Sequence, residues 1–262
     1  MLPRLLLLLT SLLAPLATMA DTITVAAAAN IKFAMEDIAR QFEADSGHKL
    51  RVSYGSSGNF ASQIRHGAPF ELFLSADERY VTHLHQSGVT ASDGDIYAYG
   101  RLALVAAKGS PLTLDENLTG LKALVASGEL RRFALANPEL APYGERGREL
   151  LKAANLWDGI KDKLVLGENV SQAAQFAISG SAQGGLVALS LAKAPQFVAR
   201  ANYVAIPEHK HAPLAQRMVL LPKASAAAQE LYAFLQGDKA RAIFADYGFS
   251  LPTKDARLEA SH

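Results

Sequence analysis

Short apolar runs alternate with segments of helical periodicity along most of the chain. The run at 22–28 is followed by apolar residues at helical spacing as far as Phe42, and the same order of strand, turn and helix returns at 50–64. Alternating patterns of this kind predict mainly parallel strands joined by helices that cover both faces of each sheet. We therefore expect an α/β fold.

Four turns of this pattern carry polar or glycine residues where a strand ends and a helix begins. They are Ala29-Asn30, Ser56-Ser57-Gly58, Pro142-Tyr143-Gly144 and Asn169-Val170-Ser171. Ligands of open α/β sheets bind beyond the carboxyl ends of the strands, so we expect the four turns to share one site. Within the second turn, Ser57 is expected at the N-cap position of its helix.

The turns offer hydrogen-bond donors but no cationic side chain, since none of them contains lysine or arginine. The first N–H groups of a helix have no intrahelical acceptor, and the helix dipole adds partial positive charge. A buried dianion without a counter-cation needs about five to eight donors, at roughly 1.5–3 kcal/mol each. Such a site should prefer a fully deprotonated tetrahedral dianion to phosphate, because a protonated oxyanion needs an acceptor.

The chain of 262 residues, half of them hydrophobic, is long enough to form two lobes. Two extended runs, Tyr97–Leu104 and Tyr203–Pro207, are candidates for segments that cross between the lobes and form a hinge. The expected division is lobe 1 at 21–99 and 205–252, lobe 2 at 100–204, and a tail at 253–262.

Residues 1–20 are expected to form a secretory signal peptide. Arg4 precedes an apolar run that starts at Leu5, and small residues lead up to Asp21. The apolar run is too short to stay in a bilayer as a permanent anchor. We therefore expect an exported protein whose mature chain begins near Asp21.

Composition and charge further limit the classes of partner that the protein is expected to bind. The formal net charge is +1, and the sequence contains no cysteine. A nearly neutral chain is not suited to nucleic acid or to an anionic membrane surface. Without cysteine the chain has no disulfide, no lipidated thiol and no thiolate ligand for a metal.

Two histidine pairs raise the question of a bound cation. His83 and His85 fall in a predicted helix, where residues two positions apart face different directions. His209 and His211 lie in a charged turn. Neither pair has the arrangement of a metal site, so no free metal cation is expected.

Two serines leave a different class of function open. Ser190 begins an S-x-x-K sequence that ends at Lys193, and Ser57 lies in a glycine-flanked turn. Penicillin-recognising enzymes also carry S-D-N and K-T-G, which this sequence lacks, and the turn at Ser57 does not fit G-x-S-x-G. A secreted serine hydrolase or acyltransferase is therefore the weaker alternative to a binding protein.

Five segments, occurring together and in order, carry a family resemblance. They read AAAANIKFAMEDIARQFEADSG, YGSSGNFASQI, GAPFELFLSADE, ANPELAPYG and GENVSQA. In these segments the chain resembles the periplasmic molybdate-binding proteins of molybdate ABC transporters, from about Asp21 to Pro252. The resemblance implies a two-lobed periplasmic binding protein of type II that closes on an oxyanion.

The same resemblance implies the function and the partners. The ligand is expected to be molybdate, with tungstate also accepted, and the protein would deliver it in the periplasm to a membrane ABC permease. No enzymatic activity and no cofactor are expected, and the protein would be a monomer. Another oxyanion, such as sulfate or thiosulfate, stays open as cargo because a fold alone does not fix function.

The resemblance also assigns ligand-binding residues. Asn30 is similar to a family residue that donates through its backbone and side chain, and Ser57 to one that donates through its hydroxyl and amide. Tyr143 is similar to a tyrosine used by one branch of the family, and Val170 to a backbone amide donor. Ala29 stands where many relatives have serine or threonine, so this chain lacks one hydroxyl donor there and relies on the amide.

Overall fold

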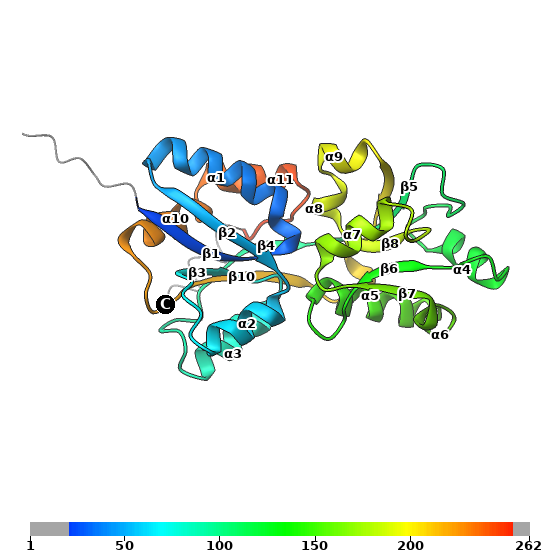
Figure 1. Ribbon diagram of the computed structural model, residues 1–262, viewed down its shortest axis with the longest axis horizontal. Coiled ribbons are helices and arrows are strands. Elements are labelled where there is room, and N and C mark those ends of the chain that lie inside the picture. The colour runs from blue at the N-terminus through cyan, green and yellow to red at the C-terminus, as the bar shows by residue number, and fades with distance from the viewer. Residues whose placement is uncertain (1–20, 254–262) are drawn as a thin grey trace, which may run out of the picture.

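The protein has two lobes, each built from one sheet with helices on both faces (Figure 1). This computed structural model describes residues 21–253. The predicted two-lobed α/β fold is confirmed. The predicted signal peptide at 1–20, and residues 254–262 of the predicted tail, lie outside the described residues. In the described range, no helix combines the length and the apolar character that crossing a membrane requires.

The sheet of lobe 1 has the strand order β2-β1-β3-β10-β4. Strand β1 pairs in parallel with β2 and β3, whereas β10 pairs antiparallel with β3 and β4. The parallel strands are joined by helical crossovers, as parallel pairing requires. The bounds are β1 (Thr22–Ala28), β2 (Lys49–Gly55), β3 (Leu72–Leu74), β4 (Asp95–Gly100) and β10 (Leu214–Leu220).

Two groups of helices cover this sheet (Figure 1). On β1, Ile23 and Val25 belong to one buried cluster and Ala26 to another, because successive side chains of a strand point to opposite faces. Helix α1 ends at Ser46 and is capped by Gly47, whose positive φ of 78° is the left-handed conformation that glycine favours at a helix end. The helices are α1 (Lys32–Ser46), α10 (Ala226–Gln236) and α11 (Asp238–Asp246) on one face, and α2 (Ser57–Arg65) and α3 (Glu78–Gln86) on the other.

The sheet of lobe 2 has the order β7-β6-β8-β5-β9. Strand β6 pairs in parallel with β7 and β8, and β5 pairs antiparallel with β8 and β9. Both sheets thus contain more antiparallel pairs than the alternation of strands and helices predicts. The reason is that the strands next to the crossing segments pair antiparallel with their neighbours in each sheet. The bounds are β5 (Leu102–Ala107), β6 (Phe133–Ala136), β7 (Leu164–Gly167), β8 (Gly185–Ala188) and β9 (Ala201–Ala205).

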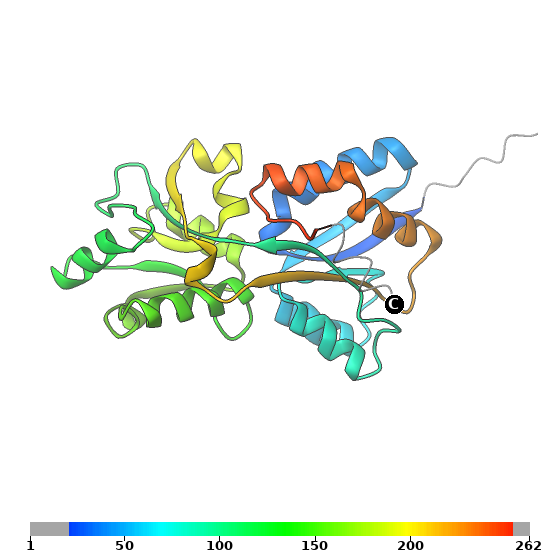
Figure 2. The same ribbon diagram turned by 180° about the vertical axis from the view of Figure 1, so that it is seen from behind.

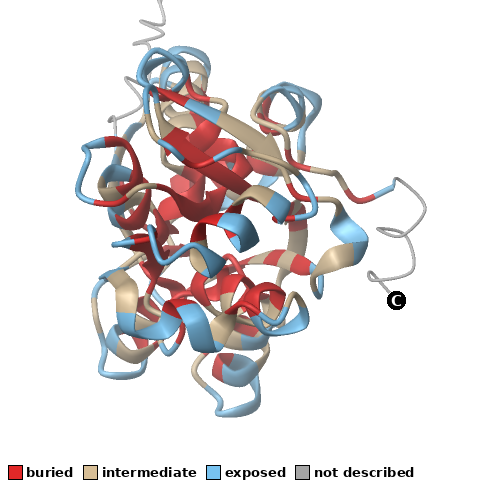
Figure 3. Cartoon of the chain, turned by 90° about the vertical axis from the view of Figure 1, so that its right-hand side faces the viewer, coloured by how far each residue is buried: buried red, intermediate tan, exposed pale blue. Residues whose placement is uncertain are grey.

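The helices of lobe 2 are shorter on average, and they too lie on both faces of their sheet (Figure 1). Buried residues lie in the interior of the protein, and exposed residues gather on the outer turns and loops (Figure 3). The helices are α4 (Thr119–Ala126), α5 (Pro142–Ala153), α6 (Trp157–Ile160), α7 (Val170–Ile178), α8 (Leu189–Ala192) and α9 (Pro195–Val198). The 3-10 helices are η1 (Ala29–Ile31), η2 (Lys161–Lys163) and η3 (Glu208–Lys210).

Two segments cross between the sheets, as predicted, and Figure 2 shows them side by side. The first passes directly from β4 to β5, with Arg101 between the two strands. The second runs from the end of β9 at Ala205 to the start of β10 at Leu214. The lobe boundaries predicted at 99–100 and 204–205 stay a prediction. The two sheets show which strands belong to each lobe, but they do not show at which residue one lobe ends and the other begins.

Candidate functional site

The predicted site residues gather between the lobes. Ala29, Asn30, Ser57, Tyr143 and Val170 are all buried, with at most 4% of the residue exposed. Each lies at the start of a helix: two in η1, and one each in α2, α5 and α7. The first helical turns of both lobes therefore meet in a space closed to bulk solvent.

Hydrogen bonds across the cleft hold the first of these turns, at Asn30, against lobe 2. The Asn30 Nδ2 of η1 donates to the Tyr143 hydroxyl of α5 at 3.4 Å. The Ser190 hydroxyl of α8 donates to the main-chain oxygen of Asn30 at 2.7 Å. These bonds join residues from opposite lobes, so they exist only while the lobes are closed.

Helix α2 makes two further contacts across the cleft. The Gly58 N–H donates to the main-chain oxygen of Leu140 at 3.1 Å, and the Asn59 side chain donates to Glu168 Oε1 at 3.0 Å. A Cβ at Gly58 would lie 2.8 Å from that Leu140 oxygen, which is closer than real contacts allow. Only glycine therefore lets α2 approach the opposite lobe this closely.

Ser57 is not the N-cap of helix α2, contrary to the prediction. Ser56 has the extended backbone of a cap, and its Oγ accepts from the Asn59 N–H at 3.3 Å. Ser57 is the first helical residue, and its Oγ accepts from the main-chain N–H of Ala76 at 2.9 Å. Because that bond uses a lone pair of the Ser57 oxygen, the hydroxyl proton stays available to another acceptor.

Three buried main-chain amides point to an anion site. Ser57 and Val170 are the first residues of their helices, and Tyr143 is the second residue of α5, so their N–H groups have no intrahelical acceptor. None of the three donates to a protein acceptor within residues 21–253. The Asn169 side chain caps α7 by accepting from the two amides that follow Val170. Unpaired amides at helix starts are the usual donors of anion sites.

A network of four neutral side chains lies beneath these amides, and we call it the floor network. The Gln216 Nε2 donates to the Tyr143 hydroxyl at 3.2 Å, and Gln216 Oε1 accepts from Asn30 Nδ2 at 3.0 Å. The Tyr97 hydroxyl donates to the same Gln216 oxygen at 2.8 Å. The floor network therefore consists of Asn30, Tyr97, Tyr143 and Gln216, joining η1, β4 and β10 to α5.

Sequence reasoning did not find Tyr97 and Gln216 as parts of the site. The available signal was a polar residue at a core position, because Gln216 lies two residues from each of the buried residues Leu214 and Met218 along β10. A glutamine on the buried face of a strand requires hydrogen-bond partners. Tyr97 lies within a predicted hinge segment, and no feature of the sequence around it indicated a role in the site.

Burial keeps the two phenols of the floor network neutral. Burial raises the pKa of Tyr143 above its ordinary value, and the hydrogen bonds from Gln216 and Asn30 offset part of that rise. Burial also raises the pKa of Tyr97 well above the ordinary value, with the neighbouring Tyr143 adding to the shift. The floor of the cleft therefore presents no negative charge to a bound anion near neutral pH.

The sequence from residue 23 to residue 250 matches the family described as bacterial extracellular solute-binding protein. The chain belongs to this family. The solute-binding protein is 38% identical to the molybdate-binding protein ModA of Azotobacter vinelandii, over 90% of this chain and 92% of that one. Its structure resembles the periplasmic molybdate-binding protein of Azotobacter vinelandii with a TM-score of 0.80 and 30% identity, covering 88% of this chain and 100% of that chain.

The same architecture occurs in a protein described for another oxyanion. The sulfate-binding protein SubI of Mycobacterium tuberculosis H37Rv matches with a TM-score of 0.73 at 16% identity, covering 92% of this chain and 90% of that chain. At this identity the likeness shows the fold alone. The cargo of the solute-binding protein has to be argued from its own site.

Five charged residues at the edge of the cleft pair with one another, in a group that we call the rim cluster. Arg79 of α3 reaches Glu145 of α5 at 2.6 Å across the lobes, and it also contacts Asp77 at 2.6 Å. Arg146 lies 3.6 Å from Asp77 and 2.5 Å from Glu149. Because these arginines are engaged by carboxylates, they do not act as counter-cations for a ligand at the buried amides.

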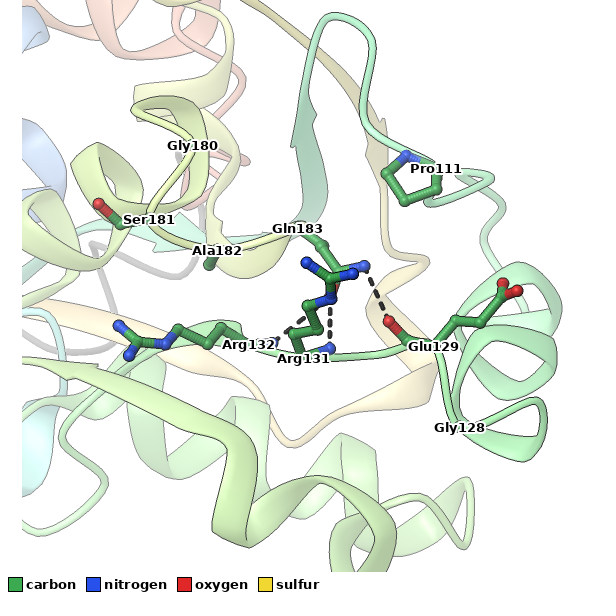
Figure 4. Close-up of a pocket in the computed structure, with 9 residues that line it drawn as sticks. All are labelled: Pro111, Gly128, Glu129, Arg131, Arg132, Gly180, Ser181, Ala182 and Gln183. Carbon is green, nitrogen blue, oxygen red and sulfur yellow. Dashed lines mark hydrogen bonds between the residues drawn. The ribbon is translucent and has the colours of Figure 1, made fainter.

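Among the hollows on the surface of residues 21–253, two differ in their distance from the predicted site. One of about 450 Å³ opens beside the site and is lined by residues that include Ala29, Lys32 and Asn169. A larger one of about 880 Å³ lies at the far end of lobe 2, where the Gln183 side chain is bound to main-chain groups of Glu129 and Arg131 (Figure 4). Exposed loops form much of this larger hollow, and it is remote from the predicted site residues.

The alternatives from sequence find little support in the geometry. In the described range, the hydrogen bonds of the Ser57 and Ser190 hydroxyls involve main-chain groups, with no histidine at either serine. No group of three or more His, Asp or Glu side chains within residues 21–253 is arranged to hold a metal ion. His83 and His85 both lie on α3, and His209 lies in η3 with His211 directly after it.

Proposed function

We propose that this solute-binding protein binds molybdate in the periplasm and delivers it to a membrane ABC permease. The observation that carries the proposal is the set of buried amides at Ser57, Tyr143 and Val170, which come from both lobes and have no protein acceptor in the described range. A tetrahedral dianion provides acceptor oxygens in several directions at once. The printed names of the relatives support molybdate as that dianion.

The proposed ligand-binding residues are those assigned from sequence. Ser57 would donate its hydroxyl and amide, Tyr143 and Val170 their amides, and Asn30 its side chain and main chain. Ala29 would contribute its amide alone. Tungstate has the same charge and tetrahedral shape as molybdate, so we propose that it binds at the same residues. The protein would act as a monomer without a cofactor and would carry out no chemistry on its ligand.

Isothermal titration with molybdate, tungstate, sulfate and phosphate tests the proposal. We expect tight binding of molybdate and tungstate, weaker binding of sulfate, and the weakest binding of phosphate, which carries a proton that a donor-rich site does not match. No heat with molybdate, or phosphate displacing bound molybdate, would refute the proposal. Small-angle scattering should also show a more compact protein with molybdate than without it, because a permease responds to a state that the ligand favours.

Sulfate or thiosulfate is the second candidate ligand, since the fold also occurs in a sulfate-binding protein. Sulfate is a fully deprotonated dianion too, so the charge of the site does not separate it from molybdate. Size separates them, because sulfate is the smaller anion and would leave some donors unpaired in a cavity made for molybdate. If sulfate or thiosulfate binds more tightly than molybdate in the same titrations, the second candidate is correct.

A further inference from the structure

Gln216 is a fully buried amide in the middle of strand β10. Its oxygen accepts from Asn30 and Tyr97, and its nitrogen donates to Tyr143. It thus touches three elements, η1, β4 and α5, and the last of these belongs to the opposite lobe. The pairing of β10 with β4 shifts register between Gln216 and Arg217, directly beside this residue.

Gly100, the last residue of β4, leaves room for the contact between Tyr143 and Gln216. A Cβ on Gly100 would lie 2.2 Å from the Tyr143 hydroxyl oxygen and 2.4 Å from Gln216 Nε2. Both distances are shorter than any real contact of a Cβ atom. Glycine at this position therefore allows Tyr143 of lobe 2 to reach Gln216 of lobe 1.

One atom of the floor network has no partner. Asn30 Oδ1 is buried and accepts no hydrogen bond within the described residues, while the nitrogen of the same amide donates to Gln216 and Tyr143. Asn30 itself is only 1% exposed. A buried acceptor without a donor is unfavourable, and a dianion close to it would be repelled. In the orientation observed, Asn30 does not offer its side-chain nitrogen to such a ligand.

The hydrogen bonds around Gln216 can run in the opposite direction without moving any other group. The two ends of a carboxamide have nearly the same shape, and a phenol can either donate or accept. If the Asn30 and Gln216 amides both turn by 180°, Gln216 nitrogen donates to Asn30 Oδ1 and to the Tyr97 oxygen. Tyr97 then donates to the main-chain oxygen of Ser75, which lies 3.2 Å away.

The reversed arrangement gives every acceptor of the floor network a donor and leaves the Asn30 nitrogen for a bound anion. Tyr143 donates its proton to the Gln216 oxygen, and Asn30 Oδ1 now has a donor. The nitrogen of Asn30 takes the place of the unpaired oxygen and becomes a donor for an anion. The reversal depends on a side chain at 216 that can both donate and accept, which a carboxylate or an apolar side chain cannot do.

We propose that Gln216 is a positioning residue that allows the Asn30 amide to turn its nitrogen toward a bound dianion. This inference rests on the proposed function, because it gives Asn30 a ligand to donate to. It also refines the expected selectivity. When its side-chain oxygen faces the ligand, Asn30 suits a protonated oxyanion. When its nitrogen faces the ligand, Asn30 suits a dianion. The residue at 216 therefore influences which of these two classes of oxyanion the protein binds.

The variant Gln216→Glu tests the proposal through its pH profile. A buried glutamate accepts but does not donate once it is ionised, so Asn30 must donate to it and keep its oxygen toward the ligand. Burial raises the pKa of such a carboxyl group, and in its protonated form it both donates and accepts as glutamine does. Molybdate affinity should fall by about tenfold or more at pH 8 and should return to within about threefold of the wild type at pH 5.5.

A double-mutant cycle separates positioning from a general effect on stability. The neutral variant Gln216→Met should weaken molybdate binding in the wild-type background by about five- to tenfold and have almost no effect on affinity in an Asn30→Ala background. Thermal melts without ligand identify the conditions in which each variant is folded. Affinities are compared only under those conditions.

The outcomes distinguish this inference from the proposed function. If the wild type binds no molybdate, the proposed function fails first. If the wild type binds molybdate, and Gln216→Glu binds it equally at pH 8 or stays equally impaired at pH 5.5, the positioning role is wrong. Full additivity of the Gln216→Met and Asn30→Ala effects would also overturn it.

Discussion

The two lobes are joined in two different ways, by the neutral floor network and by the charged rim cluster. All four residues of the floor network are buried and hold one another through uncharged hydrogen bonds. In the rim cluster, the Arg79 side chain is 58% exposed and pairs with carboxylates on both sides of the cleft. The same two lobes thus meet through uncharged groups inside and through ion pairs at the edge.

The difference follows from the cost of burying charge. An unpaired cation inside the cleft would lose its hydration whenever the lobes closed without a ligand, and this costs several kcal/mol. Amides and hydroxyls cost less to bury, and they select an anion by the direction of its lone pairs. Water screens the exposed Arg79 at the edge, so its ion pairs add little to closure. We therefore expect ligand affinity to depend on the inner residues far more than on the rim.

The largest effect should come from Ser57, with Ser56 as its matched control. Ser57→Ala removes the hydroxyl that we propose as a donor to the anion, which should weaken molybdate binding by about 10- to 100-fold. Ser56→Ala removes only the cap of α2, so it should cost about 1 kcal/mol of unfolding free energy and change affinity by less than about threefold. Calorimetric titration measures the affinities, and urea unfolding measures the stabilities.

Ser57→Ala should also destabilise the protein, because the Ala76 N–H loses its acceptor. A buried donor without a partner costs about 1–3 kcal/mol. Affinity is therefore measured at a temperature where both variants are folded. If the two serine variants had equal molybdate affinities, Ser57 would have only a structural role. The buried residues of the cleft would then not contribute more to affinity than the rim cluster.

A smaller effect is expected at the rim. Arg79→Gln removes the ion pairs of this exposed side chain with Glu145 and Asp77, and exposed pairs contribute about 0.2–1 kcal/mol each. Molybdate affinity should fall by less than about fivefold at low salt, and the difference from wild type should shrink at about 0.5 M salt because the charges are screened. Titrations at two salt concentrations measure both effects.

Arg40→Gln is the control for the rim prediction. Arg40 pairs with Asp37 within helix α1, so removing it deletes a surface ion pair that does not span the lobes. We expect no change in molybdate affinity for this variant at either salt concentration. If Arg79→Gln instead weakened binding as much as Ser57→Ala, the rim would contribute to affinity as strongly as the inner residues.

The smallest effect on binding is expected from pH. Burial raises the pKa values of Tyr97 and Tyr143 above the ordinary value of 10.0, so both phenols stay neutral and affinity should vary by less than about twofold between pH 6 and pH 9. Above about pH 10 the unfolded chain releases these protons while the folded protein keeps them. The unfolded state then binds fewer protons, and stability falls as pH rises.

Urea unfolding between pH 8 and pH 11 measures this loss. Tyr143→Phe removes one of the two buried phenols, so its stability should fall less steeply above pH 10 than that of the wild type. An identical slope in the variant would mean that Tyr143 ionises alike in the folded and unfolded states. A molybdate affinity that changes strongly between pH 6 and pH 9 would show that a charge appears on the inner surface.

Much of the fold was predictable because it depends on local patterns. The alternation of strands and helices was predicted and is confirmed, and local residues also set the helix ends at Gly47, Asp77 and Asn169. The antiparallel partners in each sheet were not, since strand pairing depends on where the crossing segments enter. The N-cap of α2 was placed one residue late, because adjacent serines differ only in backbone conformation, and Ser56 has the extended one.

The sequence by itself determined which turns could supply donors, and the absence of lysine and arginine from them determined that the donors would be neutral. Only the tertiary structure decided which polar groups lie together. Tyr97 and Gln216 are 119 residues apart, and Gln216 and Tyr143 are 73 apart, yet both pairs are hydrogen-bonded. Local sequence fixes the conformation of a turn because neighbouring residues act on it directly, whereas a buried network forms only when the closure of two lobes excludes water.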